Sequence, residues 1–170
     1  MDPGRSSRRA VVVIGYGNTL RGDDAAGPRA ASIVAGWGLS GVIATAVPQL
    51  TPELADPLAS ARLAIFVDAR LAPDGEGVEV RPIAPAVPGA ILGHAPDPGR
   101  LLALARLAFG ASPRAWLVSI PAADFALGRA LSPRAGRGLG EALRRIASLA
   151  RGAMDRGPEL EAMRRREEML

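Results

Sequence analysis

The sequence predicts a three-layer α/β fold, in which a mostly parallel, five-stranded sheet lies between helices on both of its faces. Three observations support this prediction. Short apolar, β-branched runs alternate with segments of helical character, the later helical segments begin at Thr-Pro, Asp-Pro or Ser-Pro pairs, and neither a repeat nor a linker divides the chain. At 170 residues with a hydrophobic fraction of 48%, the chain can bury the core of one domain.

The strands differ in their patterns. The first is a continuous apolar run, which is typical of a buried parallel strand. The third is a similar run that we expect to end at Asp68. The fourth alternates with period two between glycine and proline, which is typical of an edge strand. The predicted strands are residues 10–15, 42–47, 63–67, 78–83 and 115–120.

Each predicted helix has a recognisable start. Asp23 or Asp24 is placed to cap the first, and a proline at the first helical position marks the other three. Pro57 is expected to bend or shorten the second helix, and Gly110 to end the third. The predicted helices are residues 25–37, 51–60, 97–110 and 132–150. We expect a flexible basic tail at 1–9, a single α/β domain at 10–152 and a charged, helix-prone tail at 153–170.

Composition argues against several classes of protein. The net charge of +4 and the pI near 11 come from arginine alone, and an aromatic content of 4% is too low for a base-stacking surface, so no nucleic-acid partner is expected. The absence of cysteine removes disulfides, thiolate ligands and cysteine nucleophiles. The first nine residues do not resemble a signal peptide and no apolar run reaches membrane-spanning length, so we expect a cytoplasmic location and no membrane partner.

Reactive side chains follow the predicted strands. Asp23 and Asp24 lie in the loop after the first strand, Asp68 ends the third, and His94, the only histidine, follows the fourth. Ligands of α/β sheets bind beyond the carboxyl ends of the strands, so these residues are expected to converge there. Two oxygen ligands and one nitrogen ligand suit nickel, zinc or manganese. Taken separately, each residue also has a simpler explanation: a helix cap, a turn-forming aspartate, and a solvent-facing histidine.

The glycine-rich start of this loop invites comparison with dinucleotide-binding proteins. Gly15 and Gly17 follow a strand, but Leu20 stands where the third glycine should be. No acidic residue follows the second strand, and two aspartates at the helix start would repel a pyrophosphate. The sequence therefore argues against a nucleotide site.

The segment 15–27, GYGNTLRGDDAAG, resembles the opening signature of the hydrogenase maturation endopeptidases. The resemblance continues in order through Gln49–Leu54, Phe66–Ala69, His94, Asp124-Phe125, Gly128 and Leu131–Pro133, and covers roughly residues 10–150. It implies a twisted, mostly parallel five-stranded sheet. It also implies removal of the carboxy-terminal extension of the nickel-iron hydrogenase large-subunit precursor after nickel insertion.

The same resemblance implies roles for particular residues. Three nickel contacts fall on Asp24, Asp68 and His94, with the nickel supplied by the precursor. Some family members have glutamate at the first position, so Asp24 is one methylene shorter. Asp23 is a candidate for orienting a water molecule. Substrate-binding residues are expected at Gly15, Gly17, Asn18, Gly22 and Gln49. The partner is the hydrogenase precursor, and we expect a monomer or a weak oligomer.

Two other classes of protein share part of this pattern. Peptidyl-tRNA hydrolases also open with a strand and a Gly-x-Gly-Asn loop, but they carry their histidine near the amino terminus, whereas His94 lies past the middle. Receiver-type phosphorylation switches need a lysine after the fifth strand, and this chain contains no lysine. Both fit the sequence less well than the endopeptidase.

Overall fold

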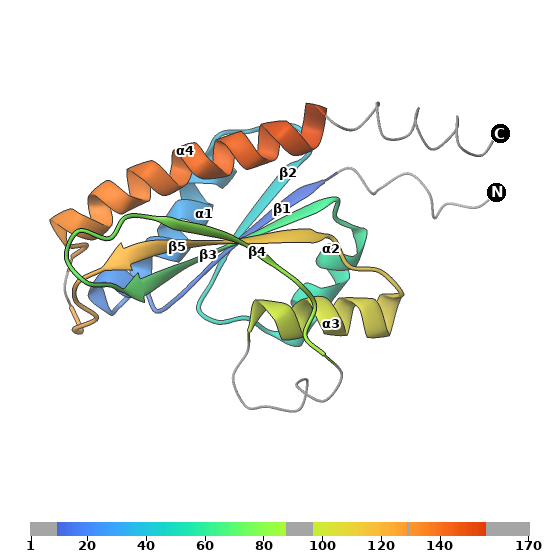
Figure 1. The fold of residues 1–170 in the computed structure, drawn as a ribbon, viewed down its shortest axis with the longest axis horizontal. Helices are drawn as coiled ribbons and strands as arrows, with labels where there is room; N and C mark the ends of the chain where they lie inside the picture. Colours follow the sequence, from blue (N-terminus) through green and yellow to red (C-terminus); the bar gives the residue numbers. More distant parts are fainter. Residues whose placement is uncertain (1–9, 88–96, 129, 156–170) are drawn as a thin grey trace.

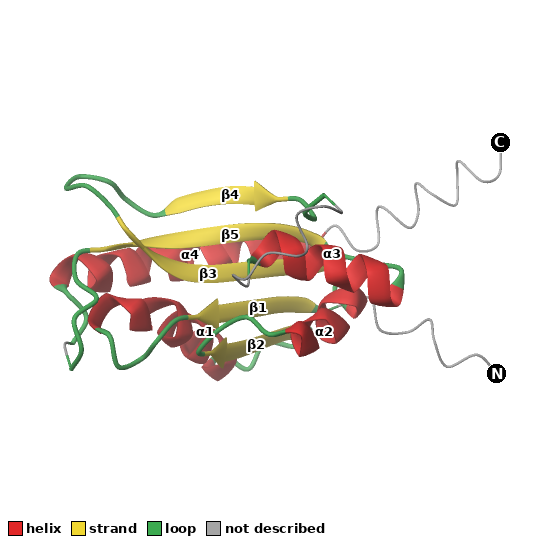
Figure 2. Ribbon diagram, turned by 90° about the horizontal axis from the view of Figure 1, so that it is seen from below, coloured by secondary structure: helices red, strands yellow, loops and turns green. Residues whose placement is uncertain are grey.

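A central sheet organises the molecule. The computed structural model describes residues 10–87, 97–128 and 130–155. Its five strands lie in the order β2-β1-β3-β5-β4, with β4 antiparallel to β5 and the other neighbours parallel (Figure 2). The strands are β1 Val11–Tyr16, β2 Val42–Val47, β3 Leu63–Leu71, β4 Glu79–Ile83 and β5 Arg114–Ala122. The predicted mostly parallel sheet and the edge position of β4 are confirmed.

Helices cover both faces of this sheet, as predicted. The α-helices are α1 Ala26–Gly36, α2 Ala55–Ser60, α3 Pro98–Phe109 and α4 Pro133–Asp155, with short 3-10 turns at η1 Gly22–Ala25 and η2 Pro52–Leu54. In Figure 1, α4 lies on one side of the sheet and α2 and α3 on the other. One apolar cluster packs α1 and α4 against the same face of the sheet, and a second cluster packs α2 and α3 against the opposite face.

Side-chain alternation places polar residues on the face covered by α2 and α3. Ile14 of β1, Phe66 of β3 and Leu117 of β5 belong to the cluster on that face. Two positions further along each strand, alternation brings Tyr16, Asp68 and Ser119 to the same face. A row of polar side chains therefore continues the apolar core toward the carboxyl ends of the parallel strands.

The third strand is longer than predicted. β3 passes through Asp68 and continues to Leu71, so the prediction that the strand ends at Asp68 is wrong. The reason is that β5 is equally long and pairs with β3 from Leu63↔Arg114 to Leu71↔Ala122. Pairing between β1 and β3 stops one residue before Asp68, at Gly15↔Val67, so the aspartate lies level with Tyr16, the last residue of β1.

The helix ends agree with the sequence at most positions. Asp97 caps α3 by accepting a hydrogen bond from the Gly99 amide at 2.7 Å, and Gly110 ends the helix with a φ of 75°. Ser132 caps α4, since its hydroxyl accepts from the Ala135 amide at 3.1 Å. η2 and α2 together replace the longer helix expected around Pro57.

Two helix predictions are wrong. Neither Asp23 nor Asp24 caps a helix, because no side-chain cap is present at η1 or α1. α4 ends at Asp155, not near Ala150, so residues 153–155 continue the helix. The predicted tail at 1–9, and residues 156–170 of the predicted tail at 153–170, lie outside the described residues. Within the described part of the chain, no helix is both long enough and apolar enough to cross a membrane.

Candidate functional site

The chain folds back on itself directly after β1. A side chain at Gly15 would collide with the Gly27 carbonyl of α1, and Gly17, at a φ of 146°, lies against the Asp24 backbone. These two glycines therefore allow α1 and the loop to pack tightly against β1. This intramolecular contact explains Gly15 without the substrate contact that we predicted for it.

Asp23 is fully buried and its carboxylate is saturated with hydrogen bonds. Oδ2 accepts from the amides of Ala123 (2.7 Å) and Asp124 (3.2 Å) and from the Ser132 hydroxyl (2.7 Å), and Oδ1 accepts from the Ser132 amide (2.6 Å). Burial alone would raise the pKa of Asp23, but these hydrogen bonds outweigh it and hold the pKa below its usual range. Asp23 thus joins the loop after β1 to the loop after β5.

The two loops are joined along their backbones as well. The Asp23 amide donates to the Asp124 carbonyl at 2.9 Å, and the Gly128 amide donates to the Leu20 carbonyl at 2.9 Å. The Arg21 guanidinium donates to the Phe125 carbonyl at 3.2 Å. The segment 18–24 is therefore held from a part of the chain about a hundred residues away in sequence.

Asp24 is half-buried, and its carboxylate accepts fewer hydrogen bonds than that of Asp23. Its Oδ2 accepts a hydrogen bond from the Asn18 amide at 2.8 Å. Within the described residues, Oδ1 has no partner. Asn18 turns inward to the loop, where its side-chain oxygen accepts from the Leu20 amide at 2.9 Å. One Asp24 oxygen is thus available to a ligand.

Asp68 is a mostly buried carboxylate with one oxygen that has no partner. The Tyr16 hydroxyl donates to Oδ2 at 3.3 Å, whereas Oδ1 is buried without a hydrogen bond in the described part of the chain. Burial raises the pKa of Asp68, and the hydroxyls of Ser119 and Tyr16 and the charges of Arg81 and Arg70 only partly oppose this. An unpaired buried carboxylate oxygen is costly in a native protein, and a ligand would satisfy it.

Tyr16 and Arg70 complete the surroundings of Asp68. Burial, and then the charge of Asp68, raise the pKa of the Tyr16 phenol well above its usual range, so Tyr16 keeps the proton that it donates. Arg70 is directed to other acids, with ion pairs to Glu76 at 3.0 Å and Glu79 at 3.4 Å. Asp68 therefore lacks a direct ion-pair partner among the described residues.

The structure places the predicted site residues in different environments. Asp24 and Asp68 both contact the short segment leaving β1, through Asn18 and Tyr16 respectively. Gly22, with a φ of 50°, begins η1, and Gln49 is exposed just after β2. His94 lies outside the described residues. Among the residues that the structure describes, no three histidine, aspartate or glutamate side chains are grouped so as to hold a metal ion.

Three neighbours of the site were missed by the sequence analysis. Tyr16 belonged to a glycine-rich motif, Ser119 to an apolar strand and Ser132 to a helix start. The register Asp68↔Ser119 pairs two residues that are 51 positions apart, so only the strand pairing reveals their proximity. Ser132 had a visible signal, since the Ser-Pro pair predicts a cap, but not its second contact with Asp23.

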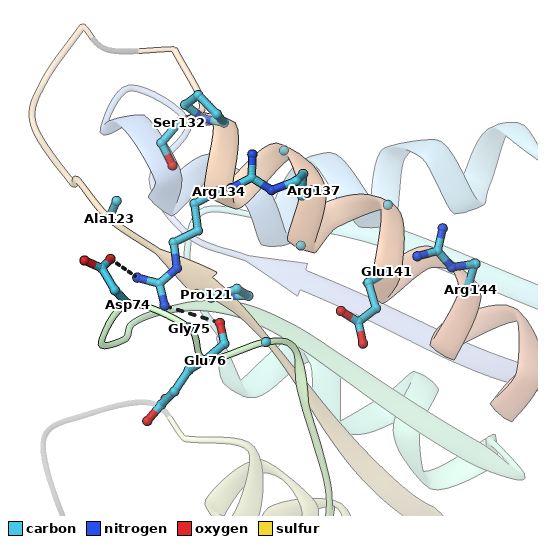
Figure 3. Close-up of a pocket in the computed structure, with 15 residues that line it drawn as sticks. Asp74, Gly75, Glu76, Pro121, Ala123, Ser132, Arg134, Arg137, Glu141 and Arg144 are labelled. Atoms are coloured by element: carbon cyan, nitrogen blue, oxygen red, sulfur yellow. Dashed lines mark hydrogen bonds and ion pairs between the residues drawn. The ribbon is translucent and has the colours of Figure 1, made fainter.

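A large cavity lies on the other face of the sheet. It has a volume of about 930 Å³ and lies between the β3–β4 connection and the first turns of α4 (Figure 3). Arg134 lines this cavity and links α4 to the β3–β4 connection, since it donates to the Ala72 and Pro73 carbonyls and pairs with Asp74 at 3.6 Å. The other acidic residues that line the cavity are also in ion pairs, Glu76 with Arg70 and Glu141 with Arg145. The cavity therefore offers no unpaired carboxylate comparable to Asp68.

Comparisons with known proteins give a consistent picture of the fold. No family model and no curated protein matches the sequence. Among solved structures, the hydrogenase maturating endopeptidase HybD from E. coli matches with a TM-score of 0.66 at 19% identity, covering 85% of this chain and 93% of that one. The [NiFe] hydrogenase maturation protease HycI from Thermococcus kodakarensis matches with a TM-score of 0.62 at 21% identity, covering 88% and 95%.

This chain has the fold of the hydrogenase maturation endopeptidases. The hydrogenase 2 maturation peptidase from a Thaumarchaeota archaeon also matches, with a TM-score of 0.60 at 21% identity, covering 82% of this chain and 97% of that one. The sequence resemblance to the maturation endopeptidases is thus confirmed at the level of the fold. These matches span nearly the whole of each solved chain.

Proposed function

We propose that this protein is an endopeptidase that removes the carboxy-terminal extension of the nickel-iron hydrogenase large-subunit precursor after nickel has been inserted. The observation that carries the proposal is the buried Asp68 carboxylate with its unpaired Oδ1, set at the end of β1 in the fold of the maturation endopeptidases. A divalent cation brought by the substrate would satisfy that oxygen.

Asp24, Asp68 and His94 are the proposed nickel contacts. Asp24 and Asp68 each have one oxygen without a partner in the described residues, and both lie against the segment leaving β1. His94 precedes Asp97 by three residues, which limits the distance between their Cα atoms to about 11 Å. The charge of Asp97 also contributes to raising the pKa of the Tyr16 phenol, after burial and the neighbouring Asp68.

The protein residues bind and orient, and the metal belongs to the substrate. Nickel bound between the precursor and these ligands would polarise the scissile carbonyl or acidify a water molecule. The Tyr16 hydroxyl donates to Oδ2 of Asp68, and Oδ1, which has no partner in the described residues, is the oxygen that would contact the metal. A precursor without nickel would lack this bridge, so the three ligands would act as a sensor of metal loading.

The role of Asp23 is revised. All four of its hydrogen bonds are made inside the protein, which leaves it poorly suited to orient a water molecule. We assign it to positioning, because it fixes the loop that carries Asp24. Asn18 and Gln49 are exposed and remain the proposed polar contacts to the substrate backbone.

Substitution of the three ligands tests the assignment. Asp24→Asn, Asp68→Asn and His94→Ala are each expected to reduce kcat/KM for the nickel-loaded precursor by about 100-fold or more, the typical loss when a group acting on the transition state is removed. Cleavage is followed by mass spectrometry, with circular dichroism as the check on folding. Asp74→Asn, a fully exposed acid on the opposite face, is the matched control and should cleave normally. Wild-type rates in all three variants would contradict the site.

A further inference from the structure

One edge of the sheet has unpaired backbone groups with a defined orientation. β2 pairs only with β1, so its other side is a free edge in the described structure. The Gly41 carbonyl accepts from Val11 and the Val47 carbonyl accepts from Gly17, at 2.7 and 3.3 Å, so odd-numbered residues direct their polar groups toward β1. By the alternation of a strand, the amides and carbonyls of Ala44 and Ala46 point outward.

The two edges of the sheet are not equally protected. β4 carries Pro82 in its middle, and its Glu79 forms ion pairs with Arg70 and Arg81 at 3.4 and 3.8 Å. Proline and charge are the usual means of preventing an edge strand from pairing with another chain. β2 has neither, since its sequence VIATAV contains only alanine, threonine and β-branched apolar residues. The side chain of Ile43 is 54% exposed on this strand.

The unprotected edge leads directly to the proposed site. β2 ends at Val47, whose carbonyl binds the Gly17 amide in the loop that holds Asn18 and Asp24. Gln49, one of the proposed substrate contacts, follows two residues later. A peptide lying along β2 would therefore have one of its ends beside this loop.

We propose that β2 binds the carboxy-terminal extension of the substrate as an added antiparallel strand, an inference that rests on the proposed function. An antiparallel strand starts at the carboxyl end of β2 and runs toward its amino end, so the residues after the scissile bond lie along β2. The outward amides and carbonyls of Ala44 and Ala46 supply the backbone hydrogen bonds, which is the general mode of strand addition.

The edge also defines the kind of segment that fits. β2 has six residues, so it pairs with a stretch of similar length, roughly 20 Å long. Ile43 and Thr45 present an exposed apolar and hydroxyl surface to one face of the added strand. We expect an extended, uncharged segment containing β-branched or apolar residues opposite Ile43.

Proline substitution removes the outward amides without removing bonds to β1. Ala44→Pro and Ala46→Pro are each expected to raise KM for the nickel-loaded precursor about tenfold or more, with kcat changed much less, because pairing with the extension lies away from the reacting bond. Val80→Pro is the matched control on the other edge: it has the same parity as Pro82, so its amide points away from β5. A KM equal to that of the wild type in both Ala44→Pro and Ala46→Pro would overturn the proposal.

Amide hydrogen exchange tests the same idea in the wild-type protein, whatever the variants do to folding. A synthetic peptide with the sequence of the extension should slow exchange at Ala44 and Ala46 at least tenfold. If the peptide leaves the exchange rates of the Ala44 and Ala46 amides unchanged while the protein still cleaves the precursor, the inference is overturned and the proposed function stands. Failure of the wild type to cleave would instead refute the proposed function. A β2-mediated dimer in sedimentation velocity, lost in Ala46→Pro, would assign the edge to a second copy and overturn the proposal.

Discussion

At the scale of single residues, Asp68 has an environment that is unfavourable for a charged carboxylate. It is mostly buried, Oδ1 has no partner in the described residues, and burial raises its pKa. A protein that tolerates such a group at a strand position usually uses it, because removing the charge would stabilise the fold. The same carboxylate is the one that the proposed nickel contact would satisfy.

Asp68→Asn is therefore expected to be more stable and yet inactive. At pH 7 the substitution should increase the free energy of unfolding by roughly 1 kcal/mol, because it removes a charge that burial disfavours, although the amide still lacks a partner at the Oδ1 position. The wild type loses stability as pH rises above the ordinary carboxyl pKa of 3.8, because the unfolded chain releases its proton first. The gain should accordingly disappear below about pH 4.

Urea denaturation at several pH values measures this difference. A variant less stable than the wild type at pH 7 would show that the hydroxyls of Ser119 and Tyr16 and the charges of Arg81 and Arg70 together outweigh burial at this position.

The sequence could place Asp24 and Asp68 in one region but could not rank Asp23 against Asp24. The two aspartates are adjacent, and either suited a helix cap. Their difference comes from Ala123, Asp124 and Ser132, which supply hydrogen bonds to Asp23 from about a hundred residues away. No local pattern contains that information.

At the scale of elements, the loop after β1 and the loop after β5 behave as one unit. Asp23 contributes four side-chain hydrogen bonds to this junction, and the backbone contributes two more links. The unit fixes the chain from Asn18 to Asp24 over the end of the sheet. Under the proposed function, rigidity here would hold Asp24 in place before a substrate arrives, which would lower the cost of binding.

Asp23→Asn should weaken this junction. An amide nitrogen cannot accept the hydrogen bonds made by one carboxylate oxygen, so we expect a loss of about 3 kcal/mol in the free energy of unfolding at pH 7. Since hydrogen bonds lower the pKa of Asp23 in the folded state, its contribution is present above the ordinary value of 3.8 and is lost as pH falls through the folded pKa. The difference between wild type and variant should shrink under acid conditions.

Asp24→Asn is the control for this comparison. Asp24 accepts a single hydrogen bond, from Asn18, which the asparagine carbonyl can still accept, so its stability should change by less than about 1 kcal/mol. Equal destabilisation of the two variants in denaturant titrations would refute the assignment of Asp23 as the structural member of the pair.

Most helices and strands could be predicted from local sequence signals, but the residues at which they end could not always be predicted. The caps at Asp97 and Ser132 and the glycine end of α3 were visible in the sequence and are present. The extension of β3 past Asp68 was not visible, because polar residues continue a strand only when a partner of equal length is available. β5 supplies that partner, and strand pairing is not a local property.

At the scale of the whole molecule, the sheet separates two different regions. The α2 and α3 face carries the polar row that ends in Asp68, while the α4 face carries a large cavity whose acids are already paired. Alternating strand and helix patterns predicted the layers and the edge position of β4. Under the proposed function, this polar row contacts the nickel that the substrate carries.

The central claim is that nickel carried by the precursor completes a site built on Asp24, Asp68 and His94. Its most direct test is intact-mass measurement of a nickel-iron hydrogenase large-subunit precursor, nickel-loaded and nickel-free, after incubation with this protein. We predict loss of the carboxy-terminal peptide from the loaded precursor alone. Equal cleavage of both forms would contradict the nickel-sensing mechanism, and cleavage of neither would contradict the proposed activity itself.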